Sequence, residues 1–239
     1  AVADSQESAS EYDLTRLANT VDGYAPKPNY IVKSALDMEL IWCPPGSFIM
    51  GSGRTAHPVV LTKGFYLGKY EVTQEEYEKV MGKNPSILIE SKNPVGMISW
   101  IDAMQFLEVI NKKERTSVSL IYTLPTEAQW EYACRAGTTT DYWWGNEEDL
   151  NLLQKPNPWG FYAMHGGVFE LCQFAMYDYP KGVSINPTGP ENSETWSNLR
   201  QEMTSRKVRR KGKSGSRGDI VQDLRYEDVG FRLCLAPAR

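Results

Sequence analysis

One carboxylate of this sequence lies in an otherwise apolar segment. Glu170 stands between Phe169 and Leu171, a few residues after the pair Gly166-Gly167. Burying a carboxylate without a partner is costly, and adjacent glycines are typical of a chain bend or of close backbone approach. The residues favour a turn that leads into a core strand. A cation site made of backbone carbonyls and the carboxylate of Glu170 stays open as the second interpretation.

The residues that could form a zinc site or a redox pair are few and scattered. Four cysteines occur, and none has the spacing of metal ligands; they are Cys43, Cys134, Cys172 and Cys234. Their apolar or helical neighbours predict buried free thiols, with a single disulfide as the alternative. Since the chain has only two histidines, a zinc site of histidine and cysteine is not expected.

A group of aromatic residues, Tyr142-Trp143-Trp144, falls in a stretch without regular periodicity. Large rings in such a stretch either anchor the loop to the core, which is the more common case, or offer a flat platform to a ligand. Trp143 and Trp144 are therefore kept as candidate ligand contacts beside the interpretation as loop anchors.

A basic run lies near the carboxy-terminal end and extends from Arg206 to Lys213. Such a run could attract nucleic acid or another anionic surface. Alternate residues of a strand point in opposite directions, however, so the run need not form one continuous positive field. The net charge of -4 also disfavours nucleic-acid binding. No stretch has the length of a membrane-spanning helix.

Short strands and three helices are predicted to position these residues. Alternating apolar residues between turn signals predict a small antiparallel sheet over residues 38–72. Each helix then begins with a hydroxyl residue and an acid or amide three positions later, which is the pattern of a capping box. These pairs are Thr73 with Glu76, Ser99 with Asp102, and Thr126 with Gln129. Gly82 and Gly137 are the predicted ends of the first and third helices.

The two ends of the chain are predicted to differ in structure. Residues 1–35 are assigned to an N-terminal extension with a short helix, because Leu14, Leu17, Ala18 and Val21 have helical spacing. A second short helix is expected around residues 196–203. Residues 229–235 are the predicted closing strand, and alternation places Phe231, Leu233 and Leu235 on one face. The chain begins with Ala1, which fits an exported mature protein and equally a trimmed one.

Several phrases of the sequence occur together in the order typical of one family. They are residues 38–51 (Met-Glu-Leu-Ile-Trp to Gly-Ser-Phe-Ile-Met-Gly), 69–73 (Lys-Tyr-Glu-Val-Thr), 93–100, 124–133 (Leu-Pro-Thr-Glu-Ala-Gln-Trp-Glu-Tyr-Ala), 157–172 and 229–233 (Val-Gly-Phe-Arg-Leu). In these phrases the chain resembles the formylglycine-generating enzyme (sulfatase-modifying factor) family. The resemblance implies an α+β, C-type-lectin-like fold for residues 36–239, with few helices, short antiparallel strands and much irregular chain.

The resemblance also implies an oxygen-dependent enzyme that oxidises a substrate cysteine with two thiols of its own near the carboxy-terminus. Such chemistry needs a thiol that is readily deprotonated. The matching region, from Lys207 to Asp228, contains no cysteine, and Cys234 lies beyond the catalytic positions. The family's Arg-Gly-Gly-Ser signature is replaced by Arg210-Lys211-Gly212-Lys213. We therefore expect no enzymatic activity, and keep an oxygen-dependent oxidoreductase as the alternative.

Calcium is a further expectation that depends on the resemblance. The family binds this ion with an Asp or Asn side chain, two backbone carbonyls and a glutamate, all of them oxygen ligands. Glu170 matches the glutamate, and Gly166 and Val168 match the carbonyls, but Ala163 stands where the Asp or Asn is needed. The segment that carries a second calcium site in the family is shortened here, between Gly145 and Lys155. We expect no required cofactor and at most one weakened calcium site at Gly166, Val168 and Glu170.

A non-enzymatic branch of the family suggests what such a chain does instead. Variable proteins of diversity-generating retroelements display a hypervariable patch just before the Gly-Phe-Arg strand, where this chain has the patternless residues 213–228. We expect a monomeric binding protein, exported or at the cell surface, whose partner is a protein or a glycan. The candidate ligand contacts are Lys213, Ser214, Ser216, Arg217, Asp219, Ile220, Asp223, Arg225, Tyr226 and Asp228, with Trp143 and Trp144 beside them.

Overall fold

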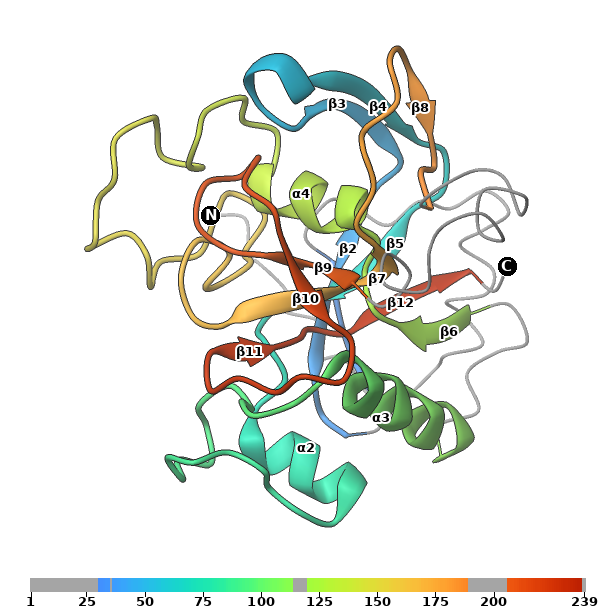
Figure 1. The fold of residues 1–239 in the computed structure, drawn as a ribbon, viewed down its shortest axis with the longest axis vertical. Helices are drawn as coiled ribbons and strands as arrows, with labels where there is room; N and C mark the ends of the chain where they lie inside the picture. Colours follow the sequence, from blue (N-terminus) through green and yellow to red (C-terminus); the bar gives the residue numbers. More distant parts are fainter. Residues whose placement is uncertain (1–29, 35, 114–119, 189–205, 238–239) are drawn as a thin grey trace, which may run out of the picture.

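Three small sheets and three α-helices make up the described part of the chain, so the expected α+β composition is confirmed (Figure 1). The computed structural model describes residues 30–34, 36–113, 120–188 and 206–237. The helices are α2 (Gln74–Met81), α3 (Trp100–Lys113) and α4 (Glu127–Arg135), and a 3₁₀ turn, η2, covers Gly53–Thr55. The strands are β1 (Ile31–Lys33), β2 (Glu39–Cys43), β3 (Gly46–Met50), β4 (His57–Leu61), β5 (Phe65–Gly68), β6 (Leu120–Thr123), β7 (Phe169–Ala175), β8 (Ser184–Ile185), β9 (Arg206–Arg210), β10 (Gly218–Val221), β11 (Val229–Gly230) and β12 (Cys234–Pro237).

The five-stranded sheet has the order β1-β2-β5-β12-β6 and is antiparallel throughout. It joins the two ends of the described chain, because β12 lies between β5 and β6 and pairs Cys234 with Leu67 and with Thr123. β1 pairs with β2 through Ile31 and Ile41. The five-stranded sheet therefore includes residues 31–33 of the segment assigned to the N-terminal extension.

The other two sheets are smaller and each contains one parallel pairing. The order β10-β9-β7-β11 combines antiparallel pairs with a parallel contact between β11 and β7, and the order β3-β4-β8 combines a hairpin with a parallel contact between β4 and β8. The expectation of antiparallel strands is thus correct except for these two short pairings. Helix α4 contacts β3, β7 and β9, and so connects the two small sheets.

Each helix begins where the capping pattern predicts. The Thr73 side chain accepts the amide N–H of Glu76, and the Glu76 carboxylate accepts the amide N–H of Thr73 at 2.8 Å. Thr126 and Gln129 form the same reciprocal pair at the start of α4. A cap of this kind contributes about 1 kcal/mol. α2 ends at Gly82 as expected, whereas α4 ends one residue before Gly137, with Ala136 in the left-handed conformation.

The alternation along β2 divides the interior into two cores. Leu40 and Trp42 face a cluster that also contains Tyr77 of α2 and Phe106 of α3. Ile41 and Cys43 face the opposite cluster, which includes Trp130 of α4. Figure 1 shows the same division, with α2 and α3 on one side of the sheet and α4 on the other. Helix α4 packs on the face of the sheet that presents Ile41 and Cys43, and the sheet and α4 together support the carboxy-terminal loops.

The predicted closing strand is split in two. Residues 231–233 leave the strand conformation between β11 and β12, and the side chain of Arg232 is fully buried there. Phe231, Leu233 and Leu235 nevertheless share the first core, as the alternation predicts. The short helices expected around residues 14–21 and 196–203 lie outside the described residues. Among the residues described, none of the helices has both the length and the apolar character that crossing a membrane requires.

Gly96 allows two segments far apart in the sequence to touch. A Cβ atom at this position would lie 2.2 Å from the carbonyl oxygen of Glu227, much closer than any real contact. The next residue, Met97, donates its amide N–H to the carbonyl of Tyr226 at 2.8 Å. The chain before α3 and residues 222–228 are therefore in direct backbone contact, and only glycine fits between them.

We expect Gly96→Ala to destabilise the fold by about 1–3 kcal/mol, because the added methyl group overpacks against a backbone atom that cannot rotate away. Gly218→Ala is the matched control, since its Cβ would meet nothing closer than 3.5 Å. Urea denaturation of both variants measures the difference. Equal stability of the two would contradict the close approach at Gly96.

Candidate functional site

The loop between β9 and β10, residues 211–217, begins at a fully buried arginine. One terminal nitrogen of Arg210 lies 2.7 Å from a carboxylate oxygen of Glu127, and the other lies 2.6 Å from Glu131. The same guanidinium also donates to the carbonyl of Ser214, within the loop. An unpaired buried charge would be very costly, so these bonds fix where the β9–β10 loop leaves the sheet.

Helix α4 supplies both carboxylates from one face. Glu127 and Glu131 are four residues apart, which places them on neighbouring turns of the same side, and both side chains are buried. Burial of two acids on one helix requires cations from elsewhere in the chain. Arg210 and Arg217 supply them from the carboxy-terminal loop, and Arg135 from the helix itself.

Arg217 holds the other end of the β9–β10 loop. Its guanidinium lies 2.7 Å from Glu127, donates to the carbonyl of Tyr177 at 2.7 Å, and lies 4.2 Å from the ring centre of Tyr179. The hydroxyl of Tyr179 also donates to Glu127 at 2.7 Å. The loop is therefore anchored at both ends on one carboxylate.

Arg135 connects this network to two further segments. It binds Glu131 at 2.8 Å and donates to the carbonyls of Gly51 and Thr140. Gly51 in turn donates its amide N–H to Glu131 at 2.8 Å. The carboxylate of Glu131 is thus saturated by donors from the end of β3, from α4 and from β9. The sequence contains a signal for this network that was missed, namely two glutamates four residues apart on the buried face of a helix.

His165 lies beside the loop in a neutral form. Its Nδ1 is 2.7 Å from the carbonyl of Gly212, and the amide N–H of Trp143 points to its Nε2 at 3.2 Å, so Nδ1 carries the proton. Burial lowers the pKa of His165. The ring nitrogens lie within 4 Å of the Cys134 sulfur, which also contacts the Ser214 hydroxyl.

The aromatic group is adjacent to the β9–β10 loop. Trp144 stacks on Tyr142 with ring centres 4.9 Å apart, and Trp143 meets Trp144 edge to face. Asp141 accepts the amide N–H of Ser214 through its carbonyl and pairs with Lys213 through its carboxylate at 2.9 Å. The structure thus brings Trp143 and Trp144 next to the predicted contact Lys213, although their positions are almost 70 residues apart in the sequence.

The segment from β10 to β11, residues 222–228, lies at a different place, against the start of α3. Arg225 pairs with Asp102 at 2.7 Å, and Ile101 donates its amide N–H to the carbonyl of Gln222. The exposed residues of the β10–β11 segment include four predicted contacts; they are Asp223, Arg225, Tyr226 and Asp228. The predicted site is therefore divided into two regions joined by β10, where Asp219 is half-buried.

Three of the predicted contacts are scaffold residues. Ser214 and Ile220 are buried, with exposed fractions of 0% and 4%. The side chain of Arg217 is only 15% exposed and is occupied by Glu127. In this structure these three side chains hold the scaffold together and are not displayed to solvent. Lys213 and Ser216 are exposed and remain predicted contacts.

The basic run does not form one field, as the alternation of strand side chains predicts. Arg210 is buried in the ionic network, whereas the guanidinium of Arg209 lies over the ring of Phe169, 4.1 Å from its centre. Lys211 lies 5.0 Å from the same ring. Among the residues of the run whose side chains the structure describes, the charges are thus used in three separate places: at the α4 carboxylates, over Phe169, and at Asp141, which pairs with Lys213.

The thiols are free and buried, as predicted. Desolvation raises the pKa of Cys134 to about 12 and raises the pKa of Cys43 and Cys172 well above the ordinary value. The reactive form of cysteine is the thiolate, which burial disfavours. Cys234 lies inside the second core, two strands away from Cys43 in the five-stranded sheet.

Glu170 has the partner that its place in an apolar segment requires. Its carboxylate receives two bonds from Arg232, at 2.5 Å and 2.6 Å, and one from the indole N–H of Trp130 at 2.7 Å. Both oxygens are engaged, and Arg232 is 0% exposed. The interpretation of this segment as a turn followed by a core strand agrees with β7.

The residues expected to hold calcium do not fit the ion in this arrangement. A cation bound to Glu170 would have to share its oxygens with the guanidinium of Arg232, and Ala163 offers no side-chain oxygen. Within the described ranges, no three His, Cys, Asp or Glu side chains gather closely enough to hold a metal ion. The weakened calcium site at Gly166, Val168 and Glu170 stays a prediction.

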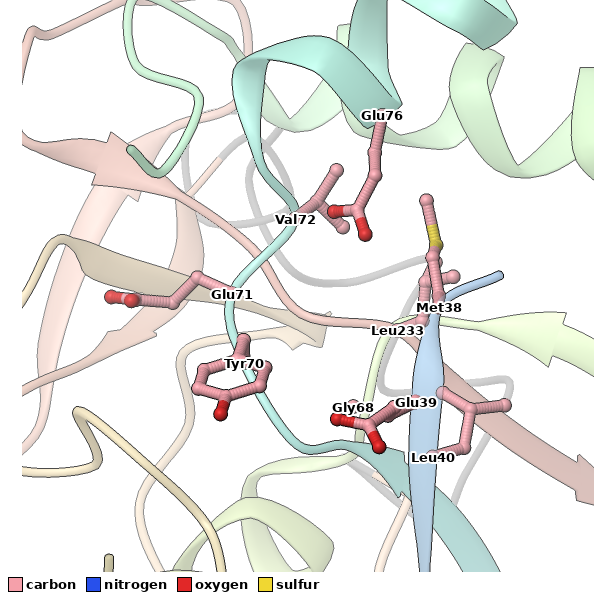
Figure 2. Close-up of a pocket in the computed structure, with 9 residues that line it drawn as sticks. All are labelled: Met38, Glu39, Leu40, Gly68, Tyr70, Glu71, Val72, Glu76 and Leu233. Carbon is pink, nitrogen blue, oxygen red and sulfur yellow. The ribbon is translucent and has the colours of Figure 1, made fainter. Parts of the chain in front are cut away.

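A second buried carboxylate, Glu71, lies close to this ion pair. It accepts the amide N–H of Val168 at 2.9 Å, and burial together with the charge of Glu170 raises its pKa to about 8. The residues around it line a shallow pocket formed by Met38, Leu40, Tyr70 and Glu76 among others. Glu71 also lines this pocket, but Figure 2 shows its carboxylate pointing away from Met38 and Leu40.

Comparison with known proteins agrees with the phrases noted in the sequence. The sulfatase-modifying factor enzyme 1-like domain matches residues 31–236. The chain belongs to this family. The fold is accordingly the C-type-lectin-like one that the resemblance implies, and the solved structure of Treponema denticola variable protein 1 matches it with a TM-score of 0.71 and 21% identity, over 87% of this chain and 99% of that one.

Two relatives show how varied the family is. The chaperone protein LppX of Paenibacillus barcinonensis is 25% identical over 221 residues, which is 66% of this chain and 75% of the relative. The formylglycine-generating enzyme of Mus musculus is 39% identical over 143 residues, and these cover 47% of this chain and 36% of the enzyme. A shared family therefore leaves the activity of this chain to be argued from its own residues.

We expect Arg210→Met to destabilise the fold by about 3–5 kcal/mol, because it leaves buried carboxylates without their partner. Arg209→Met is the matched control. It removes a cation–π contact with Phe169, which contributes about 0.5–1 kcal/mol. Urea denaturation distinguishes the two, and a similar small loss in both variants would show that the network at Arg210 does not anchor the loop.

The raised pKa of Glu71 predicts that the stability of the fold depends on pH. Its pKa is about 8 in the folded chain and near 4.5 in the unfolded one, so the folded state binds the extra proton between these values. The free energy of unfolding should therefore fall as the pH rises from about 5 to about 8. Glu71→Gln should flatten this slope, which urea melts at several pH values measure. An unchanged slope would mean that Glu71 is ionised in the folded state.

Proposed function

We propose that this chain is a ligand-binding protein whose exposed carboxy-terminal loops form the binding surface. The proposal rests on one observation: some residues of the β9–β10 loop and its ends anchor the backbone, and others are exposed to solvent. Arg210 and Arg217 anchor it on buried carboxylates, while Lys213 and Ser216 between them are exposed. A rigid scaffold that presents chemically mixed loops is the usual way in which proteins mount binding sites.

The composition of the exposed residues supports the same proposal. Tyr226 has an exposed fraction of 46%, and the side chain of Arg225 is 50% exposed. Tyrosine and arginine are enriched at positions that dominate protein–protein binding. Trp143 and Trp144 add flat rings beside Lys213. The partner that these residues suit is a protein or a glycan, encountered at the cell surface or outside the cell.

The alternative is an oxygen-dependent oxidase like the formylglycine-generating relatives. Two features disfavour this activity. The region that carries the family's catalytic thiols has no cysteine, and burial raises the pKa of Cys134 and Cys172. A non-enzymatic role, as in the variable proteins of diversity-generating retroelements, agrees better with these residues.

A display experiment tests the proposed division between anchors and contacts. The first library randomises Lys213, Ser216, Asp223, Arg225 and Tyr226, and is selected against two unrelated purified proteins, lysozyme and streptavidin. We expect binders specific for each target, with melting temperatures close to that of the parent chain, because the anchors are intact. A second library randomises the anchors Arg210, Ser214, Arg217 and Ile220, and should yield mostly unfolded chains.

Two outcomes would contradict the proposed binding function. If the first library unfolds as often as the second, the exposed positions are structural and the binding surface is wrong. If the parent chain, incubated with copper, oxygen and a peptide that carries the sulfatase motif, converts the peptide cysteine to formylglycine, the protein is an enzyme. Mass spectrometry of the peptide detects this conversion.

A further inference from the structure

Three consecutive large aliphatic residues are exposed in the loop between α2 and α3. The exposed fractions are 58% for Ile87, 78% for Leu88 and 68% for Ile89. Single exposed aliphatic residues are common on soluble proteins, but a contiguous group of this kind marks an interaction surface. Neither the anchors of the β9–β10 loop nor the buried ion pairs explain why these side chains point outward.

The backbone of this loop is held firmly, so the exposure is built into the fold. The buried side chain of Gln74 donates to the carbonyl of Leu88 at 3.0 Å and accepts the amide N–H of Glu90 at 3.0 Å. The first amides of α2 donate to Ser91 and Asn93. Three exposed aliphatic side chains are thus presented on a fixed support.

The aliphatic loop lies beside the β10–β11 segment of the proposed binding surface. Ser86 accepts the amide N–H of Gly96 at 3.1 Å, and Gly96 is also the residue that Glu227 approaches closely. Three further exposed apolar residues lie where the β10–β11 segment meets the start of α3: Ile101, Leu224 and Tyr226, with exposed fractions of 38%, 45% and 46%. In Figure 1 the chain that leads into α3 lies next to the chain entering β11, on the side of the molecule away from β8.

The charges around these apolar residues are mostly negative. Asp223, Glu227 and Asp228 of the β10–β11 segment are exposed, as is Glu90 next to Ile89, while Lys83 is an exposed positive charge of the same loop. Arg225 is paired with Asp102, and Lys92 is paired with Glu75. An acidic border repels an anionic bilayer. It would also face itself across the two-fold axis of a dimer, because an isologous interface brings the same patch together.

We infer that Ile87–Ile89, together with Ile101, Leu224 and Tyr226, forms a docking surface for a protein segment that carries large apolar side chains flanked by lysine or arginine. This inference rests on the proposed function and adds the class of partner to it. The apolar side chains exclude water at the centre of the contact, and the acidic border selects basic neighbours.

The probe is a library of random twelve-residue peptides displayed on phage and selected on the immobilised full chain. We expect enriched peptides in which two or more large apolar residues lie next to lysine or arginine. The triple variant Ile87→Ser, Leu88→Ser, Ile89→Ser should weaken binding of these peptides at least about tenfold, as measured by fluorescence anisotropy. The change Asp223→Asn, Glu227→Gln, Asp228→Asn should lower the affinity and its dependence on salt.

The matched control is Leu150→Ser, Val183→Ser, Ile185→Ser, which removes three aliphatic residues of similar exposure, 71%, 64% and 61%, elsewhere on the surface. It should change the affinity less than about twofold. Equal losses in both triple variants, or enriched peptides without the apolar and basic pattern, would overturn the inference. Two other results would also overturn the inference. One is a dimer in sedimentation equilibrium that the loop variant abolishes. The other is binding to phosphatidylcholine–phosphatidylserine vesicles that the loop variant abolishes.

A third variant separates this inference from the proposed function. If the selected peptides lose affinity with Trp143→Ala, Trp144→Ala, Lys213→Ala and not with the loop variant, the chain is a binding protein and the docking surface is wrong. If the parent chain enriches no peptides and the display library yields no binders, both proposals are wrong.

Discussion

The buried ion pairs between Arg210 and the two carboxylates of α4 are the constraint on which the carboxy-terminal half of the molecule depends. Glu127 and Glu131 are acids on the buried face of a helix, and such acids are tolerated only when cations meet them. Arg210 arrives from β9, Arg217 from the start of β10, and Arg135 from α4 itself. A chain that folds α4 into the core must therefore bring these segments to it, which fixes the β9–β10 loop without requiring any regular structure inside the loop.

A second group of buried charges holds irregular chain in place at the contact of β11 with β7 in the four-stranded sheet. Arg232 binds Glu170 across the parallel contact of β11 with β7, and Glu71 lies within electrostatic reach. Burial, and after it the nearby charge of Glu170, raises the pKa of Glu71. Arg232 supplies the positive charge that meets the Glu170 carboxylate. Both groups show this fold using buried charge to hold irregular segments in place.

The sequence predicts the elements of this structure better than it predicts the roles of individual residues. The capping pairs at Thr73 and Thr126 and the alternation along β2 are local, and local patterns depend on backbone geometry that any chain shares. Ser214 and Arg217 are held inside because the loop folds back onto α4, and no local pattern records this. Ile220 is buried for another reason, since β10 places it in the first core. Burial within an irregular segment depends on partners distant in sequence. The place of Glu170 among apolar residues predicts a partner, and Arg232 is that partner. The same reasoning predicts cationic partners for Glu127 and Glu131, but the sequence alone does not identify them.

The separation of anchors from exposed residues also explains how one fold can serve both enzymes and binding proteins. Catalysis by thiols needs an accessible sulfur whose proton leaves readily, and the sulfurs of this chain lie inside cores that disfavour the thiolate. Binding needs only that side chains face solvent from a fixed backbone. Arg210 and Arg217 hold the loop, whereas Lys213 and Ser216 are exposed, and the proposed function rests on this difference. The same logic holds on the other side of β10, where Gln74 supports Leu88 from beneath and leaves its side chain free to meet a partner.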